Sequence, residues 1–304
     1  MARSNSLPAH ALRVRTYAEL EGFARAFADG HLNLLILCGD PGIGKSQCVR
    51  HAVGDRVGWV DGNASAFGIY LRAFEHRGEP IVLDDIDGLY RDRNGVRLLK
   101  ALCQADREKA VGWHTDAPDR HGVPRRFTTT SRVAVIANEW RSLNADVAAL
   151  EDRGHALSFE PAAAEVHRRA ADWFWDQDVF DFVADHLHLV AGHSLRTYVL
   201  AWELKRAGLD WRRGVLGRCL AGTALTVARL KADPAYPTEE DRVRAFVASG
   251  VGCRATYFNH ARRLQPAAPR PEIKLARSAP PAPPGPPQGI LDLLRRRFGE
   301  LGCG

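Results

Sequence analysis

Residues 39–46, GDPGIGKS, carry the clearest chemical pattern in this 304-residue chain. Glycines let backbone N–H groups approach phosphate oxygens closely, and a lysine at this spacing can reach the β- and γ-phosphates of a nucleotide. The serine that follows the lysine is suited to hold Mg²⁺ through its hydroxyl. We therefore predict that this loop binds a nucleoside triphosphate. The expected contacts are Gly39, Asp40, Pro41, Gly42, Ile43, Gly44, Lys45, Ser46 and Gln47.

The segments on either side of the loop are the elements that this chemistry requires. Residues 31–38 form an apolar run typical of a buried strand, which we expect to be the first strand, and residues 45–51 fit a helix. Where a strand ends and a helix begins, backbone N–H groups and the positive end of the helix dipole converge on phosphate oxygens. The loop is therefore expected to work as a phosphate site.

A second candidate lies where an apolar run over residues 80–83 meets the acidic residues Asp84 and Asp85. An aspartate at such a strand tip can hold Mg²⁺, and its neighbour can polarise the attacking water. We assign the first role to Asp84, together with Ser46, and the second to Asp85. The alternative is a buried strand that runs into a solvated acidic turn. Asp87 is expected to cap the next helix.

A third apolar run, residues 132–137, ends in a polar amide at Asn138. An amide side chain both donates and accepts, so it can hydrogen-bond a terminal phosphate or a water molecule. It could equally cap the turn that follows. Between the acids and this run, we expect a helix over residues 88–110 and a long polar loop over 111–131. Arg125 and Arg126 in that loop could contact a phosphate or a partner subunit, although solvated surface arginines are the default.

Taken in order, the stretches GDPGIGKS, IVLDDID and VAVIAN resemble the Walker A, Walker B and sensor 1 elements of AAA+ ATPases. The resemblance covers about residues 14–235. Two later stretches extend it: LEDRGH resembles the segment that carries the arginine finger, and GHSLR resembles sensor 2. This sequence departs from the common AAA+ pattern at Asp85, where many members of the family carry glutamate. The aspartate side chain is shorter, which is compatible with slow hydrolysis.

The resemblance implies ATP and Mg²⁺ as cofactors and gives Arg153 and Arg196 roles in catalysis. Arg153 would stabilise the charge on the leaving phosphoryl group of a neighbouring subunit, which implies a homo-oligomer. Arg196 would reach the phosphates of its own subunit. The alternatives are a local ion pair for Arg153, with Glu151, Asp152 or Glu160, and a surface position for Arg196. Aromatic residues at 173–182 are interpreted as the core of a helical lid.

The C-terminal part contains two short helical stretches, residues 238–249 and 254–264, across a glycine-containing turn. This arrangement resembles a helix-turn-helix, and the second stretch is rich in arginine, asparagine and hydroxyl side chains that suit duplex DNA. From Tyr236 onward there are eleven Lys and Arg against six Asp and Glu, so this part holds +5 of the net charge of +6. Helical hairpins with basic surfaces are also common without DNA binding.

Residues 265–289 are rich in proline and alanine, so we expect a semi-rigid linker, followed by a short basic tail helix over 290–304. Either could dock a protein partner. The six cysteines are scattered without a metal-binding or disulfide spacing, which predicts reduced thiols and a cytoplasmic location. No apolar run approaches the length of a membrane span, and we expect no membrane contact.

These observations predict an α/β fold of the P-loop NTPase type, with a parallel sheet flanked by helices. The expected division is a flexible N-terminus (1–13), the ATPase core (14–160), the helical lid (161–235) and a helix-turn-helix (236–264), before the linker and tail. The expected function is ATP hydrolysis coupled to a DNA transaction such as replication initiation, helicase loading or transposition. The alternatives are a nucleotide-gated assembly switch and a protein-remodelling ATPase without direct DNA binding.

Overall fold

The computed structural model describes residues 10–86, 92–138, 152–187, 194–220, 222–264, 273 and 275. Its centre is a six-stranded sheet in which every pair of neighbouring strands is parallel, in the order β1-β8-β2-β7-β4-β3. The strands are β1 (Leu12–Val14), β2 (Leu34–Gly39), β3 (Gly58–Asp61), β4 (Ile81–Asp84), β7 (Val133–Ala137) and β8 (His155–Phe159). The α/β class predicted from the sequence, with helices flanking a parallel sheet, is confirmed.

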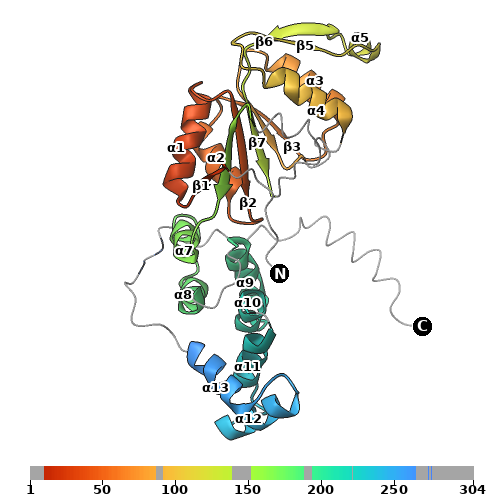
Figure 1. Cartoon of the computed structure of the whole chain (residues 1–304). Helices are drawn as coiled ribbons and strands as arrows, with labels where there is room; N and C mark the ends of the chain where they lie inside the picture. Colours follow the sequence, from red (N-terminus) through yellow and green to blue (C-terminus); the bar gives the residue numbers. More distant parts are fainter. Residues whose placement is uncertain are drawn as a thin grey trace, which may run out of the picture.

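Helices cover both faces of this sheet (Figure 1). They are α1 (Tyr17–Ala28), α2 (Lys45–Val53), α3 (Ala66–Glu75) and α4 (Arg93–Leu102). All six residues of β2 are buried, because alternate side chains enter opposite cores: Leu35 packs with the α1 and α2 side chains, and Ile36 with those of α3 and α4. This two-sided burial explains why β2 reads as a continuous apolar run.

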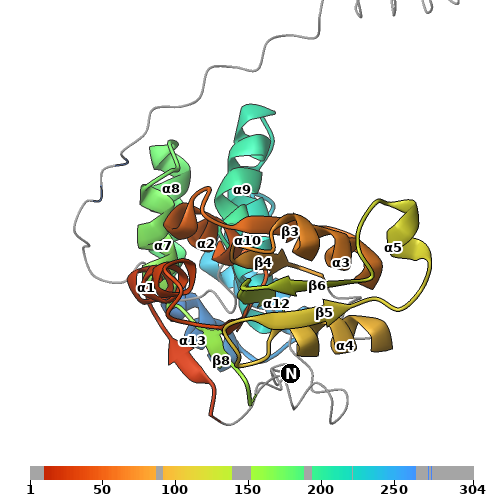
Figure 2. The same cartoon turned by 90° about the horizontal axis from the view of Figure 1, so that it is seen from above.

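An antiparallel hairpin, β5 (Lys109–Gly112) and β6 (Arg126–Thr129), lies next to α3 and α4, with the short helix α5 (Ala117–Arg120) between its strands (Figures 1 and 2). The helix predicted over 88–110 is confirmed only over residues 93–102. Its last two residues and part of the loop predicted over 111–131 form the strands β5 and β6 instead. α4 ends at Leu102, and Asp92 caps its start. In each strand of the hairpin, buried and exposed residues alternate over only four positions. A pattern this short does not identify a strand from the sequence alone.

Two further strands, β1 and β8, were not predicted from the sequence. Residues 1–13 were expected to be unstructured, and residues 31–38 to form the first strand, but Leu12–Val14 forms β1 and pairs with β8. β8 in turn lies beside β2, with His155 paired to Leu35 and Phe159 to Gly39. These short strands are specified by the neighbours with which they pair rather than by a local pattern.

The described residues between 161 and 235 lie mostly in helices, as predicted. The helices are α7 (Ala163–Ala171), α8 (Gln177–His186), α9 (Arg196–Arg206), α10 (Trp211–Cys219) and α11 (Gly222–Ala232). Phe174, Phe180 and Tyr198 lie in a buried core of their own, which confirms that most of the aromatic cluster is structural. In Figure 1 these helices extend from the sheet toward the C-terminal helices, with α7 and α9 nearest the sheet.

The two predicted C-terminal helices are confirmed as α12 (Glu239–Ala248), capped by Thr238, and α13 (Arg254–Arg263). They pack with α11 around Val227, Val243, Phe246 and Tyr257. α11 also contributes Ala228 to the core of the preceding helices, so one helix belongs to both packed units.

Within the described ranges, no helix is long and apolar enough to cross a bilayer. Asp87 and the predicted tail helix over 290–304 lie outside the described residues, as do residues 1–9. The predicted linker over 265–289 also lies outside them, except for Ile273 and Leu275.

Candidate functional site

The predicted phosphate loop connects the end of β2 to the start of α2, as its chemistry requires. Gly42 and Gly44 have φ angles of 81° and 79°, a left-handed conformation that favours glycine. A Cβ atom at Gly39 would lie 2.6 Å from the carbonyl oxygen of Phe159, and one at Gly42 would lie 2.3 Å from Ser194 Oγ. The glycines therefore let the loop backbone fit between β8 and the start of α9.

Lys45 is the most constrained side chain of the loop, with 5% of its surface exposed. Its ammonium donates to the carbonyl oxygens of Gly39 (2.7 Å) and Asp40 (2.9 Å) and to Asn138 Oδ1 (3.1 Å), which uses all three of its N–H groups. Burial lowers the pKa of Lys45 to about 8, against the opposing effect of the neighbouring acidic groups. A phosphate oxygen could replace Asn138 Oδ1, the one side-chain oxygen among the three acceptors of the Lys45 ammonium.

Ser46 and Asp84 come together as predicted: the Ser46 hydroxyl donates to Asp84 Oδ1 at 2.8 Å. Burial raises the pKa of the Asp84 carboxyl, and the Ser46 hydrogen bond opposes that shift. Hydroxyl and carboxylate oxygens are ligands that suit Mg²⁺, which commonly takes one or two protein ligands together with phosphate oxygens and waters. No cluster of three His, Cys, Asp or Glu residues that could hold a metal ion occurs among the described residues.

Asp85 has a φ of 56°, the one positive φ outside glycine in the part of the chain that the structure describes. This conformation carries a cost on the order of 1–2 kcal/mol for an L-residue. Its amide donates to the carbonyl of Ile136 (2.9 Å), and its carboxylate accepts from Asn138 Nδ2 (3.0 Å). The backbone and the side chain of Asp85 are thus both held against the end of β7.

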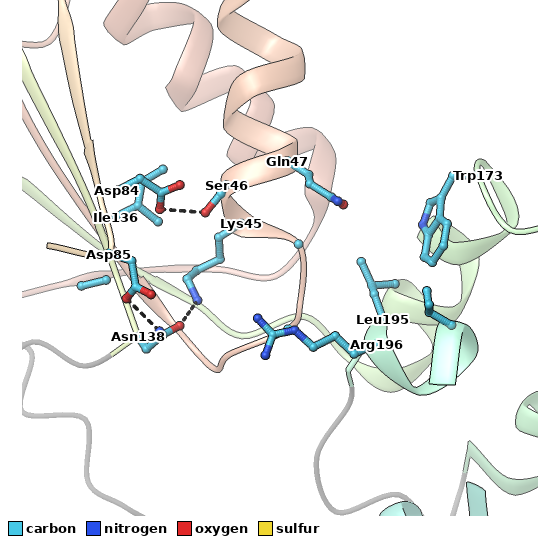
Figure 3. Close-up of a pocket in the computed structure, with 14 residues that line it drawn as sticks. Lys45, Ser46, Gln47, Asp84, Asp85, Ile136, Asn138, Trp173, Leu195 and Arg196 are labelled. Carbon is cyan, nitrogen blue, oxygen red and sulfur yellow. Dashed lines mark hydrogen bonds between the residues drawn. The ribbon is translucent and has the colours of Figure 1, made fainter. Parts of the chain in front are cut away.

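Asn138 links the two halves of the site because β7 lies between β2 and β4 in the sheet. Its amide oxygen accepts from Lys45, and its amide nitrogen donates to Asp85 (Figure 3). Both the donor and the acceptor of the amide are therefore used, by Asp85 and Lys45. The predicted contact of Asn138 with a phosphate or a water stays a prediction. The structure thus places Lys45, Ser46, Asp84, Asp85 and Asn138 around one cavity.

Arg196 is at the start of α9, on the other side of the loop. The amide of Leu195 donates to the carbonyl of Gly42 at 2.8 Å, so the loop backbone is bonded directly to this helix start. Arg196 lines the same cavity as Lys45, Ser46, Asp84, Asp85 and Asn138, and Figure 3 shows its side chain directed toward the loop. The cavity has a volume of about 340 Å³.

Arg153 lies elsewhere. It precedes β8, whose last residue is level with Gly39, so it stands roughly 20 Å away along the strand direction. Its guanidinium donates to the carbonyl oxygen of Lys100 near the end of α4, and Arg153 does not line the cavity. Arg125 pairs with Asp116 at 2.6 Å on the exposed hairpin, which matches the default interpretation of a surface arginine.

Sequence reasoning missed several residues of the site, among them Tyr17 and Trp173. The Tyr17 hydroxyl donates to the carbonyl oxygen of Ile43 at 2.6 Å, and its amide donates to Glu165 of α7, so α1 ties the loop to the helical part. Trp173 was interpreted as core with the other aromatic residues, but it lines the cavity. Neither residue belongs to a motif that could have revealed its position.

No family model and no curated protein matches the chain. Among solved structures, one similar chain is NtrX from Brucella abortus in complex with ATP, at 13% sequence identity and a TM-score of 0.40. The match covers 84% of this chain and 69% of that chain. A likeness of this size carries no functional inference.

Proposed function

We propose that the chain is an AAA+-type ATPase that binds ATP with Mg²⁺ and hydrolyses its β–γ phosphoanhydride bond. One observation carries the proposal: the glycine loop, the Ser46–Asp84 pair and the Lys45–Asn138–Asp85 network meet around one cavity. These are the groups that phosphoryl transfer needs, namely a cradle for the phosphates, oxygen ligands for Mg²⁺ and an acid beside the attacking water. The free thiols of Cys38, Cys48, Cys103 and Cys253 suit a cytoplasmic protein.

The geometry suggests how the side chains act. Lys45 can keep its bonds to the carbonyls of Gly39 and Asp40 while it exchanges Asn138 for a phosphate oxygen. The Asn138 amide oxygen is then free to accept from the attacking water, and Asp85 accepts the proton that this water releases. Arg196 adds positive charge from α9 as negative charge builds on the phosphoryl oxygens. Mg²⁺ on Ser46 and Asp84 would neutralise charge on the β- and γ-phosphates.

Replacing Asp85 with asparagine tests this assignment. Asp85→Asn keeps the shape of the side chain and should bind ATP as the parent does, while steady-state turnover falls by about 10²–10⁴-fold, the usual contribution of a general base. ATP affinity by calorimetry and phosphate release should be measured on the same preparations. An unchanged turnover rate removes Asp85 from this role.

A homo-oligomer is part of the proposal because Arg153 cannot reach the cavity of its own chain. At roughly 20 Å from the loop, Arg153 could complete only a neighbour's site. Arg153→Ala should bind ATP and lose turnover. Mixing it with Asp85→Asn should restore activity, because some mixed interfaces then pair an intact Asp85 with an intact Arg153. Mixtures as inactive as the separate variants would contradict a finger supplied between subunits.

DNA coupling is supported by the helical hairpin at the C-terminus. Asn259, Arg262 and Arg263 are exposed along α13, whereas Tyr257 is buried and serves the core. Arg254 forms an ion pair with Glu240 at 2.7 Å, which partly neutralises its positive charge. Phosphate contacts from such arginines are weakened by salt through counterion release.

Steady-state ATP turnover with and without duplex DNA, at low and moderate salt, separates the candidate functions. A rate that rises with DNA and loses the rise at higher salt supports a DNA transaction such as replication initiation, helicase loading or transposition. Near-zero turnover with ATP-dependent assembly would favour a nucleotide-gated switch. Stimulation by protein but not DNA would favour remodelling of a partner, for which the segment over 265–304 remains the predicted docking site.

A further inference from the structure

The cavity has a second end, away from the acidic residues, that the proposed phosphate chemistry does not use. Trp173, Leu195 and Val199 line it, and Figure 3 shows Trp173 facing Gln47 across the opening. Asp84, Asp85 and Asn138 lie at the opposite side, with the loop and Lys45 between the two. A nucleotide whose terminal phosphate lies near Lys45 would therefore extend its other end toward Trp173, because the loop cradles the phosphates in the middle.

Trp173 is held firmly in this position. It follows Asp172, the C-cap of α7, and its amide donates to the carbonyl of Ala170 at 3.2 Å. Its ring packs edge to face on Phe174, with centroids 5.7 Å apart and planes at 76°, and Phe174 is fully buried. The indole is thus fixed by the core on one side while it lines the cavity on the other.

The indole N–H groups of Trp173, Trp175 and Trp59 are all buried without a hydrogen-bond partner among the described residues, so this feature does not distinguish Trp173. What distinguishes Trp173 is that it lines the cavity. Leu195 and Val199 supply no acceptor through their side chains, so this end of the cavity offers an aromatic ring with apolar neighbours. Such a surface recognises flat ring systems by stacking.

We propose that Trp173 stacks on the base of the bound nucleotide and makes the site selective for purine over pyrimidine nucleoside triphosphates. This inference rests on the proposed nucleotide site. A purine presents two fused rings to the indole, whereas a pyrimidine presents one, so the contact area and the affinity differ. The Gln47 amide can both donate and accept, so it excludes neither adenine nor guanine. ATP and GTP should therefore bind with similar affinity, and CTP more weakly.

Calorimetric titration of the full chain with ATP, GTP, CTP and inorganic tripolyphosphate, each with Mg²⁺, tests the proposal. Trp173→Leu keeps an apolar side chain but removes the ring, and it should weaken ATP and GTP by about five- to 150-fold, the range found for base–aromatic stacking. Tripolyphosphate has no base, so its affinity should be unchanged. Trp173→Phe retains a ring and should keep most of the purine preference.

Trp175→Phe is the matched control, since Trp175 belongs to the same aromatic group but does not line the cavity. It should leave the affinity for all four compounds unchanged. The thermal unfolding midpoint of each variant checks its fold, and Trp173→Phe keeps the test open if Trp173→Leu does not fold.

Equal ATP affinity in folded Trp173→Leu and the parent would overturn the stacking role, as would a parent that binds CTP as tightly as ATP. If tripolyphosphate binds the parent in both cases, the phosphate site stands and only the inference on Trp173 fails. If the parent binds neither ATP nor tripolyphosphate, the proposed function itself fails, and the inference falls with it.

Discussion

Two lysines of this chain have nearly the same surroundings. Lys45 and Lys109 are both buried, with 5% and 1% of their surfaces exposed, and burial lowers the pKa of each. Each donates to an asparagine Oδ1 and to backbone carbonyl oxygen, with Lys109 bonded to Asn33 (2.6 Å) and Ser131 (2.7 Å). Burial and hydrogen bonding alone would not tell which lysine binds a ligand.

The two lysines differ in what their asparagine partners contact. Asn138, beside Lys45, also holds Asp85 and lines a cavity, so a phosphate can take its place. Asn33, beside Lys109, donates to the carbonyl of Gln104, so this lysine joins the start of β5 to the segments that precede β2 and β7. Lys109 does not line the cavity beside Lys45. We infer that Lys45 is part of the binding machinery and that Lys109 is structural.

The largest effect should come from truncating Lys45. Lys45→Ala removes a charged donor to the phosphates, and ATP affinity should fall by about 2–3 kcal/mol, or thirty- to 150-fold. Calorimetric titration with ATP measures this loss at a temperature where the variant is folded, because Lys45→Ala also leaves the carbonyl oxygens of Gly39 and Asp40 without their donor. Parent-like ATP affinity in this variant would remove the phosphate-site assignment.

The matching change at the other lysine should lower stability without weakening ATP binding. Lys109→Ala leaves the buried oxygens of Asn33 and Ser131 without their donor, which should cost about 2–3 kcal/mol of stability in urea unfolding. ATP affinity at a temperature where the variant is folded should stay within about twofold of the parent. If Lys109→Ala weakened ATP binding as much as Lys45→Ala does, the distinction between the two lysines would be lost.

Raising the pH should weaken ATP binding through Lys45 and not through Lys109. The Lys45 pKa of about 8 means that the ammonium is mostly charged at pH 7 and mostly neutral at pH 9. Phosphates bind the charged form, so ATP affinity should fall on the order of tenfold as the pH rises between these values. Lys109→Ala should keep this pH profile at a temperature where it is folded, whereas the residual binding of Lys45→Ala should be flat.

The smallest predicted effect concerns the tyrosine that steadies the loop beneath Lys45. Tyr17→Phe leaves the buried carbonyl oxygen of Ile43 without its donor and should cost about 1 kcal/mol, measured by urea unfolding with and without ATP. The loop is expected to contact the phosphates of ATP. Tyr17→Phe should therefore lower the free energy of unfolding at least as much in the presence of ATP as in its absence. A change confined to the free form would mean that Tyr17 supports folding and not the site.

The residues around the predicted phosphate loop could be found from the sequence because each belongs to a local pattern. Each of three apolar runs is followed directly by a glycine-rich loop, by acidic residues or by an amide. Parallel strands place their carboxyl ends at one edge of the sheet, and Lys45, Asp84 and Asn138 lie together there. The same reasoning gave the helices after residue 161 and the pair α12 and α13.

Only the tertiary structure decided the rest. The sequence did not place β7 between β2 and β4, which is the reason that Asn138 contacts both Lys45 and Asp85. It did not reveal β1, β8 or the β5–β6 hairpin, since strands of three to five residues depend on partners distant in the chain. The sequence also could not show that Trp173 lines the cavity while its neighbour Phe174 is buried in the core. Which face of an aromatic cluster meets a cavity depends on how α7 and α9 pack against the loop, and long-range contacts alone fix that packing.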